Sequence, residues 1–488
     1  MIGIIPAAGK GTRAYPYTKK ITKGMLKIHQ KPLLLNTILI MRDKMGIDEI
    51  YIVIGHMSHT IKDYFGDGKD FGVKITYLVN KHLSRGLAYS VLQAKKYVDD
   101  YCCVILSDEF YLDTNHDELV ATDNREAIVT CMVKEGSREK DIRKNYSVTL
   151  SGDRIVELVE KPKHPPNDIL GSGTWIMQKK FFDYIENEFH KNPESSGNLI
   201  GIIDKANKAG ETVRAFKLKG DYININNKDD INQANNLARM KIIKQSKVSL
   251  VMLIENNDTV ASSIISGYIA ENKLFELILV ASNPPNQIKT LINSLNFLNV
   301  QMIITPPSIK RYGEQLIYGL KKATGDIIVI TTNDQSFLPK DIEKLLMYIC
   351  EADMVIGTRT TRQMIEQGTN MNTLVRLANY FLAKLIELLW YDRQVRLTDV
   401  GCVFRALWKD TFLEIQESLK SKGAEFSSEM IVEILQRRMR IIEIPVNYCK
   451  NTDEQHIDLP NRRVGLFLGM IKLILKKRFF VYSYKGPF

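Results

Sequence analysis

The chain is 488 residues long, with 44% hydrophobic residues, 25% charged residues and a formal net charge of +11. That length exceeds what one hydrophobic core normally serves, so we expect two domains of roughly 240 residues each or three smaller ones. The composition is that of a globular protein and excludes the disordered, fibrous and membrane-spanning classes. The positive charge favours an anionic partner, and nucleic acid, phosphorylated small molecules and lipid headgroups would each satisfy it.

The cysteines and the N- and C-terminal segments indicate the cellular compartment of the protein. Six cysteines form no CxxC pair and no cluster with histidine at metal-ligand spacing, which indicates a reducing compartment and argues against structural zinc. The N-terminal MIGIIPAAG has the pattern of a strand running into a loop and lacks the basic region of a signal peptide. The apolar segments near the C-terminus are interrupted by Lys472 and Lys476 and are shorter than the roughly 20 residues that span a bilayer. We therefore expect a cytoplasmic protein.

Short β-branched apolar runs alternate with amphipathic segments along the whole chain. In the first half they cover residues 2–7, 49–55, 74–79, 102–107 and 127–133, and in the second half 248–254, 275–281, 300–305, 326–332 and 352–357. This alternation predicts βαβ units and mostly parallel sheets flanked by helices. Because each half starts the same rhythm again, we predict two α/β domains in tandem, with a boundary near Gln245 to Ser249.

A glycine-rich stretch follows the first predicted strand. Ala8, Gly9, Gly11 and Thr12 would let backbone N–H groups point at phosphate oxygens, since glycine tolerates close approach and positive φ. The stretch is neither a GK[ST] phosphate loop nor a GxGxxG dinucleotide fingerprint. Taken alone, it is equally compatible with an ordinary strand-to-helix turn.

Two cations accompany this loop, Arg13 directly after it and Lys23 ten residues later. The full stretch PAAGKGTRAYPYTKKITKGMLKIHQKPLL resembles the signature AAGxGTRLxPxTxxxxKxxLPVxxKP of the sugar-1-phosphate nucleotidyltransferases, the NDP-sugar pyrophosphorylases. RGLAYSVLQA, VILSDEF and VELVEKP follow in the family's order, and the resemblance runs from Met1 to about Leu237.

The resemblance implies a role for each matching residue. Arg13 and Lys23 would hold a nucleoside triphosphate, Gly86 would pack on the nucleobase, Asp108 would bind Mg²⁺ or Mn²⁺, and Lys161 would meet the sugar phosphate. These roles fit the chemistry, because nucleotidyl transfer needs charge neutralisation and in-line positioning more than acid–base catalysis. Each residue also has a structural alternative: the lysines could be solvated and Asp108 could cap a helix.

The family's second metal-binding aspartate is absent from this chain. Asn224 stands at its position in YININNKDD, and Asn226 follows two residues later. An amide oxygen can coordinate Mg²⁺, although with less charge compensation than a carboxylate. We therefore expect both asparagines to contribute to a weaker metal site. The change leaves open other substrates, including alcohol phosphates such as phosphocholine.

The second half is anchored by DIIVITTNDQSFLPKDIEKLL and TDVGCVFRA. It resembles the family 2 glycosyltransferases of the polyprenyl-phosphate sugar transferase type from about Val248 to Lys450. The resemblance implies Rossmann-like, glycosyltransferase-A type architecture, a nucleotide-sugar donor and a lipid-linked or other glycan acceptor. It assigns Asp334 to the metal, Asp399 to the catalytic loop, Arg359 and Arg405 to phosphates, and Glu429 to a helix lining the site.

Several acidic residues of that second family are replaced here. Ala281 and Ser282 stand where aspartates hold the nucleobase, and Thr332 stands at the first metal aspartate. The donor is then held differently or activity has been lost. Asp399 could be a structural cap and Glu429 a paired helix residue. The alternative to a bifunctional enzyme of polysaccharide biosynthesis is therefore a nucleotidyltransferase with a non-catalytic binding or membrane-docking module.

The C-terminal tail is strongly basic, with seven basic and no acidic residues from Arg462 to Phe488. Its helical period, like that of residues 372–391, gives an amphipathic helix that could lie in an anionic headgroup layer or pack against the core. We predict domains at 1–245 and 246–455 and a tail at 456–488, with peripheral contact at the inner membrane face as an open alternative. No nucleic-acid-binding motif is present. The oligomeric state, including a homo-oligomer, stays open.

Overall fold

The computed structural model divides the chain into two compact units, Met1–Ala238 and Arg239–Pro487. It describes residues 1–122, 126–192, 194–254, 258–271, 273–284, 286, 288, 290, 292, 299–333, 335–367, 369, 371–393, 395–450 and 460–480. The division lies within helix α8 (Lys228–Ile242), so the predicted boundary near Gln245 follows the end of that helix.

A nine-stranded mixed sheet forms the centre of the first unit, in the order β5-β4-β1-β6-β11-β8-β12-β10-β9. Its strands are β1 (Ile2–Pro6), β4 (Glu49–Ile54), β5 (Lys74–Val79), β6 (Tyr101–Ile105), β8 (Val129–Lys134), β9 (Tyr146–Ser151), β10 (Arg154–Glu160), β11 (Leu170–Gln178) and β12 (Val213–Lys217). Strands β4, β1 and β6 are parallel and buried on both faces, which is why they read as continuous apolar runs.

Two short ribbons complete the strands of this unit. They are β2 (Lys27–Ile28) with β3 (Lys31–Pro32), and β7 (Glu109–Leu112) with β13 (Asp221–Asn224). The second ribbon is antiparallel and pairs Asn224 with Glu109. It therefore brings residues separated by more than a hundred positions to one end of the sheet.

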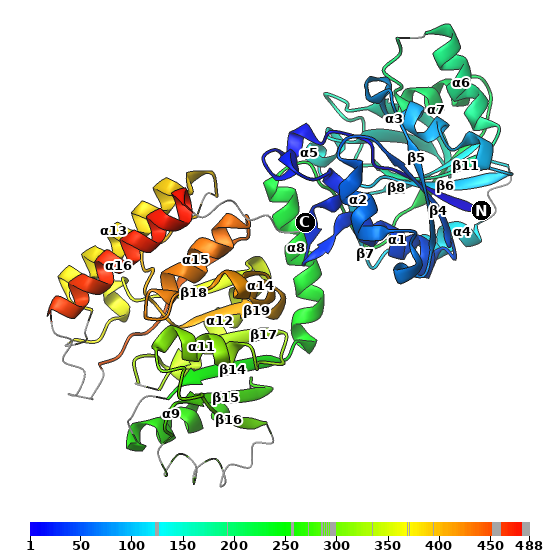
Figure 1. Ribbon diagram of the computed structural model, residues 1–488. Helices are drawn as coiled ribbons and strands as arrows, with labels where there is room; N and C mark the ends of the chain where they lie inside the picture. Colours follow the sequence, from blue (N-terminus) through cyan, green and yellow to red (C-terminus); the bar gives the residue numbers. More distant parts are fainter. Residues whose placement is uncertain are drawn as a thin grey trace. The chain divides into compact units, whose positions relative to one another are not determined.

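Helices cover both faces of this sheet and create two separate apolar cores (Figure 1). One face carries α3 (Gly86–Leu92), α6 (Phe181–Lys191) and α7 (Leu199–Lys208), and the other α1 (Leu33–Leu39), α2 (Ser58–Phe65) and α4 (His116–Ala121). The short α5 (Glu139–Ile142) precedes β9. The doubly wound arrangement predicted from the sequence is confirmed for this unit.

The second unit is built on a seven-stranded sheet in the order β16-β15-β14-β17-β19-β18-β20. Its strands are β14 (Val248–Leu253), β15 (Glu276–Ala281), β16 (Val300–Ile304), β17 (Ile327–Thr332), β18 (Met354–Thr358), β19 (Arg405–Trp408) and β20 (Ile441–Pro445). Only β19 runs antiparallel to its neighbours. The mostly parallel mixed sheet matches the predicted fold class.

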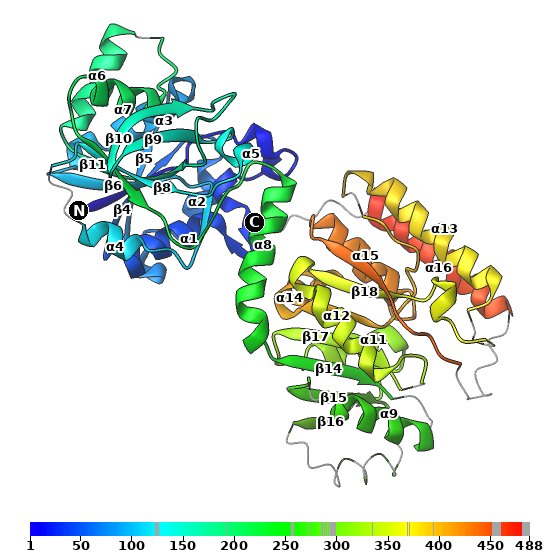
Figure 2. The same ribbon diagram turned by 180° about the vertical axis from the view of Figure 1, so that it is seen from behind.

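Helices flank this second sheet as well (Figure 2). They are α9 (Asp258–Ala270), α11 (Tyr312–Leu320), α12 (Ile342–Tyr348), α13 (Thr373–Leu389), α14 (Lys409–Ile415), α15 (Phe426–Gln436) and α16 (Pro460–Phe479). Helix α16 contacts both α15 and α13. Within the described residues, no helix combines the length and the apolar character that crossing a bilayer requires.

Candidate active site

The first unit has a cavity of about 400 Å³ at the carboxyl ends of β1 and β6. This edge of a parallel sheet is where ligands bind in open α/β folds, because loops and helix N-termini converge there. The cavity is lined by most of the residues predicted for the first site: Ala8, Gly9, Gly11, Thr12, Arg13, Lys23, Gly86, Asp108 and Asn226. The fold thus gathers positions that the sequence spreads over more than 200 residues.

The glycine loop leaves β1 and turns into a short 3₁₀ segment, Thr12–Ala14. Gly11 has a φ of +62°, a conformation that side chains disfavour. Its carbonyl accepts a 2.7 Å hydrogen bond from the Thr18 hydroxyl. Gly9 would meet nothing within 4 Å if it carried a Cβ, so open space lies beside the loop.

Gly86 begins α3 with a φ of +73°, and its position is tightly enclosed. A Cβ there would stand 1.9 Å from the Ser196 carbonyl oxygen. Glycine is therefore required for packing between the start of α3 and the 196–197 backbone. The predicted contact of Gly86 with a nucleobase stays a prediction.

Lys23, Asp108 and Asn226 meet at the floor of the cavity. The Lys23 ammonium lies 2.7 Å from Asp108 Oδ2 and donates a 3.2 Å hydrogen bond to Asn226 Oδ1. Asn226 Nδ2 in turn donates to Asn224 Oδ1 at 3.0 Å. One carboxylate and one amide oxygen thus contact the Lys23 ammonium, and a second amide adjoins them through Asn226. Carboxylate and amide oxygens are the donors that a hard divalent cation prefers.

A second cavity of about 430 Å³ adjoins the first, since Arg13, Leu87, Leu106, Asp108 and Asn226 line both. Its other lining side chains are largely polar or aromatic and include Glu109, Lys144, Asn145, Tyr146, Glu160, Lys161, Trp175 and Asn224. The two spaces therefore share a wall that includes Asp108. This geometry suits two substrates that react with each other near one acidic residue.

Lys161 reaches the second cavity from the end of β10. Its backbone N–H donates to the Asn145 carbonyl at 2.7 Å, and its ammonium lies 2.5 Å from Glu160 Oε1. The side chain is 46% exposed, so this ion pair holds it only weakly. The ammonium is therefore available to an anionic ligand.

The carboxyl of Glu109 was missed by sequence reasoning. It is fully buried, and burial together with the adjacent Asp108 charge raises its pKa to about 7. Its oxygens accept hydrogen bonds from the Tyr111 and Tyr222 hydroxyls, both at 2.6 Å, and from the Gly173 N–H. An acidic residue at the start of an apolar run, directly after Asp108, was the signal that could have revealed it.

At the corresponding edge of the second unit, the described residues include neutral side chains at three positions that carry carboxylates in the family pattern. Asp334 lies outside the described residues. Thr332 and Ala281 end β17 and β15, and Ser282 bonds with both the Gln315 amide and the Thr305 hydroxyl. Neutral contacts therefore occupy the positions where the family resemblance predicted carboxylates.

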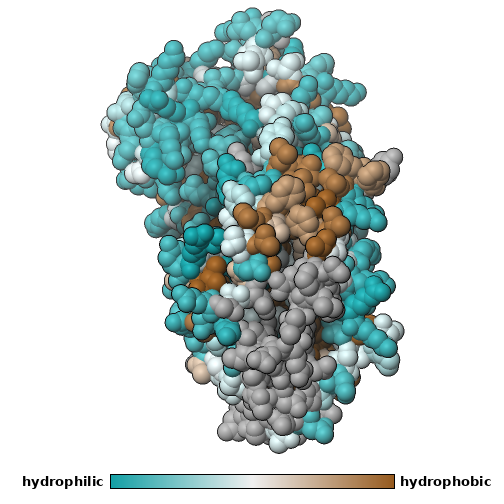
Figure 3. Space-filling model, turned by 90° about the vertical axis from the view of Figure 1, so that its left-hand side faces the viewer, coloured by the Kyte–Doolittle hydropathy of each residue, from teal (hydrophilic) through white to brown (hydrophobic). Residues whose placement is uncertain are grey.

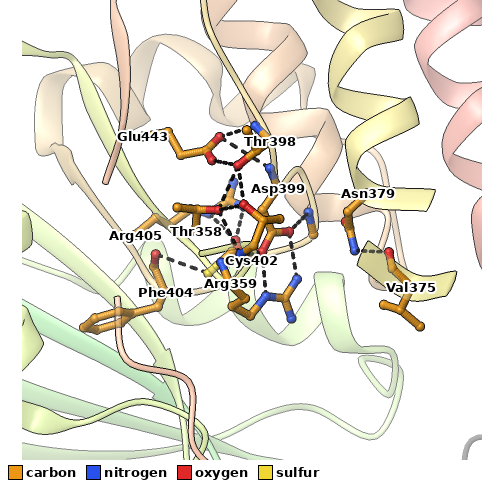
Figure 4. Close-up of polar contacts among 12 residues, drawn as sticks. Thr358, Arg359, Val375, Asn379, Thr398, Asp399, Cys402, Phe404, Arg405 and Glu443 are labelled. Carbon is orange, nitrogen blue, oxygen red and sulfur yellow. Dashed lines mark hydrogen bonds and ion pairs between the residues drawn. The ribbon is translucent and has the colours of Figure 1, made fainter. Parts of the chain in front are cut away.

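Asp399 and Arg359 form a buried ion pair in this second unit (Figure 4). Arg359 donates through Nε at 2.8 Å, Nη2 at 2.9 Å and its backbone N–H at 3.1 Å. Burial alone would raise the pKa of Asp399, but the guanidinium and these hydrogen bonds hold it below its usual value. Glu443, on β20, accepts hydrogen bonds from the N–H and hydroxyl of Thr398 and so holds the residue that precedes Asp399.

Arg405 and Glu429 lie inside the unit with protein partners. Burial lowers the pKa of Arg405 to about 10, and its guanidinium donates to the carbonyls of Cys402 and Ser427. Glu429 accepts from the backbone of Lys420 and Ser421 and lies 2.7 Å from the Lys477 ammonium. The structure therefore brings neither side chain to a described cavity, and their predicted roles beside substrate stay predictions.

Residues 2–240 match the family of nucleotidyl transferases, and residues 257–410 match glycosyl transferase family 2. The chain is a nucleotidyl transferase domain followed by a family 2 glycosyl transferase domain. Both families predicted from the sequence are confirmed, and both are families of transferases.

Several characterised proteins are similar to part of the chain. The "Bifunctional protein GlmU" of Methanococcus maripaludis is 31% identical over 272 residues, which cover 54% of this chain and 60% of that protein. The "UTP--glucose-1-phosphate uridylyltransferase AglF" of Haloferax volcanii is 26% identical over 240 residues, covering 48% of this chain and 95% of that protein. A solved UDP-glucose pyrophosphorylase of Acinetobacter baumanii is 21% identical, with a TM-score of 0.43 and coverage of 49% of this chain and 94% of that one.

Nucleotidyl transferases of this family generally use a divalent metal. In the nucleotidyl transferase domain the groups that fit such an ion are Asp108, Asn224 and Asn226, because all three carry hard oxygen donors and are linked through Lys23 and Asn226 by ion pair and hydrogen bonds. Within the described residues, no cluster of three or more His, Cys, Asp or Glu side chains could hold a metal.

Proposed function

We propose that the nucleotidyl transferase domain joins a nucleoside triphosphate to a sugar 1-phosphate, giving an NDP-sugar and pyrophosphate. The observation that carries this proposal is the pair of cavities that share Asp108 in their walls, with Lys23 beside it. One cavity has a glycine loop and cations suited to a triphosphate. The other has Lys161 at its rim and polar groups suited to a phosphorylated polyol.

Each residue around the two cavities would have a role set by its position. Gly9, Gly11 and Thr12 would present the backbone, and Arg13 and Lys23 would neutralise the triphosphate and the pyrophosphate that leaves. Lys161 would hold the sugar phosphate so that one of its oxygens attacks the α-phosphate in line. Asp108, Asn224 and Asn226 would hold Mg²⁺ or Mn²⁺, which supplies further charge neutralisation when bound.

A pyrophosphate-release assay tests this function. The purified chain is supplied with each triphosphate in turn, together with hexose 1-phosphates or phosphocholine. Lys23→Ala and Asp108→Ala should each lower release by roughly a hundredfold or more. Lys69→Ala is the matched control, because Lys69 forms a fully exposed ion pair with Asp67. Full activity in either site variant would refute the site, and release with phosphocholine alone would identify an alcohol-phosphate enzyme.

We propose further that the second domain transfers a sugar from a nucleotide-sugar to an acceptor, possible acceptors being a polyprenyl phosphate or another glycan. The family match supports glycosyl transfer. Asp334 would bind the metal, Asp399 and Arg359 would lie near the reacting groups, and residues 456–488 would give peripheral membrane contact. A fusion would deliver the product of the first domain to the second in one cytoplasmic polypeptide.

A second candidate, a non-catalytic module, is favoured by specific features of this domain. Thr332, Ala281 and Ser282 replace carboxylates, and Asp399 is fully buried against Arg359. Hydrolysis of nucleotide-sugars by the full chain, compared with Asp334→Ala, separates the candidates. Hydrolysis that depends on Asp334 would exclude the non-catalytic module. If the full chain neither hydrolyses a nucleotide-sugar nor binds one in the presence of metal, glycosyl transfer is excluded.

A further inference from the structure

Exposed apolar side chains gather on the outer side of the last two long helices of the second domain. Helices α13 and α16 lie side by side (Figures 1 and 2), with the rings of Phe381 and Phe467 6.0 Å apart. Figure 3 shows the resulting apolar patch over these helices. We call it the α13–α16 ridge and define it by Leu374, Leu377, Phe381 and Leu388 of α13 and Val464, Leu468, Leu475 and Phe479 of α16.

The ridge follows the period of the helices. On α13 its members recur at spacings of three, four and seven residues, which place them on one face. Leu374 and Leu388 are 77% and 71% exposed, so the two ends of this face are equally bare. A continuous apolar face of this kind on a folded protein marks an interaction surface.

The opposite face of α16 is already packed. Met470 and Ile474 are buried in the domain core. The Lys477 ammonium lies 2.7 Å from Glu429 Oε1 and 2.5 Å from Glu433 Oε1, and is nearly inaccessible. These contacts anchor α16 on α15. The ridge is therefore not a core face left bare by a displaced helix.

Among the described residues of α13 and α16, the charge is mostly positive. Lys472, Lys476 and Arg478 are exposed on α16, which contains no acidic residue. Glu387 is the only acidic residue of α13, and the Lys384 ammonium neutralises it at 2.7 Å. Apolar side chains flanked by cations are complementary to an interface of acyl chains and anionic headgroups.

We propose that the α13–α16 ridge docks on the surface of an anionic lipid bilayer. This deepens the proposed peripheral membrane contact, on which it rests, by adding α13 and by naming the charge of the lipid. The helices lie in the plane of the interface, with the apolar side chains among the upper acyl chains. A second copy of this chain fits less well, because a two-fold interface places the same surface of both copies face to face. Lys472 and Lys476 of one copy would then lie near the lysines of the other.

Sedimentation of the full chain with vesicles tests the docking surface. Vesicles of phosphatidylglycerol and phosphatidylcholine are compared with vesicles of phosphatidylcholine alone. Leu377→Glu on α13 and, separately, Leu468→Glu on α16 should each lower the partition coefficient by about tenfold or more. Met347→Glu is the matched control, since Met347 is 70% exposed on α12, outside the ridge. Lys472→Gln should lower binding by roughly fivefold, with anionic vesicles only.

Three results would overturn the proposal. The wild-type chain could stay in the supernatant with anionic vesicles, or both ridge variants could sediment as Met347→Glu does. Light scattering could instead show a wild-type dimer that Leu377→Glu dissociates, without vesicle binding, which would make the ridge an interface between copies. Vesicle binding requires no catalysis, so a chain that binds vesicles but releases no pyrophosphate refutes only the proposed function.

Discussion

The two domains hold the acidic residues of their predicted sites in opposite ways. In the nucleotidyl transferase domain Asp108 is 29% exposed and faces two cavities beside Lys23. In the glycosyl transferase domain Asp399 has no exposed surface and is held by three donors of Arg359. An acidic residue that matches a family motif can thus either line a cavity or be buried in an ion pair within the protein, and its exposure distinguishes the two cases.

The largest expected effect is a loss of stability when the buried Arg359–Asp399 ion pair is broken, in contrast to the partly exposed Lys23–Asp108 pair. Arg359→Ala leaves the Asp399 carboxylate buried and unpaired, which should cost about 3 to 5 kcal/mol of the second domain's stability. Calorimetry of the full chain should show a lower transition for that domain and unchanged pyrophosphate release. Arg362→Ala, at an exposed position, is the control. A transition that does not move would show that the pair is dispensable.

The next effect concerns the packing that shapes the first cavity. Gly86→Ala places a Cβ against the Ser196 carbonyl at positive φ, and we expect a loss of about 3 to 4 kcal/mol in the free energy of unfolding. Gly152→Ala is a matched control with similar φ but nothing within 4 Å, so it should cost only about 1 to 2 kcal/mol. Equal losses in denaturant titrations would exclude the steric explanation.

The buried carboxyl of Glu109 predicts a pH dependence of stability in the first domain. Its folded pKa of about 7 exceeds the unfolded value near 4.5, so the unfolded state loses its proton first as the pH rises. Its favourable contribution is therefore complete below about pH 4.5 and is lost towards pH 7, by on the order of 3 kcal/mol.

Denaturant midpoints of the wild type and Glu109→Gln, measured from pH 4.5 to 7.5, test this dependence. The wild type should lose stability relative to the variant over that window. Glu135→Gln, at an exposed position, should follow the wild type. Parallel curves for the wild type and Glu109→Gln would mean that the Glu109 carboxyl does not titrate there.

The smallest expected effect is a gain in Mg²⁺ affinity at the proposed metal site. Asn224→Asp restores the carboxylate of the family pattern, and the added charge should tighten Mg²⁺ binding by roughly tenfold or less. The Mg²⁺ dependence of pyrophosphate release measures the change, with the exposed Asn192→Asp as control. An unchanged Mg²⁺ requirement would place the ion away from Asn224.

Sequence reasoning recovered the fold because short, β-branched apolar runs such as residues 49–55 alternate with amphipathic segments, which is typical of strands covered on both faces. It also named half of the residues around the first cavity, since the motif fixes their spacing along the chain. It missed Glu109, whose importance depends on Tyr222, a residue 113 positions away. It could not foresee that Lys477 of the tail would pair with Glu429 of α15.

The sequence by itself determined the two families, the two α/β sheets, the glycine-rich composition of the first loop and the basic, amphipathic character of the tail. These are properties of local spacing, composition and charge. Only the tertiary structure decided which acidic residues face a cavity and which are neutralised, and which side of α16 is left bare. Those outcomes depend on burial and on partners brought from distant strands and helices, and the free energy of a charge depends on its surroundings more than on its neighbours in the chain.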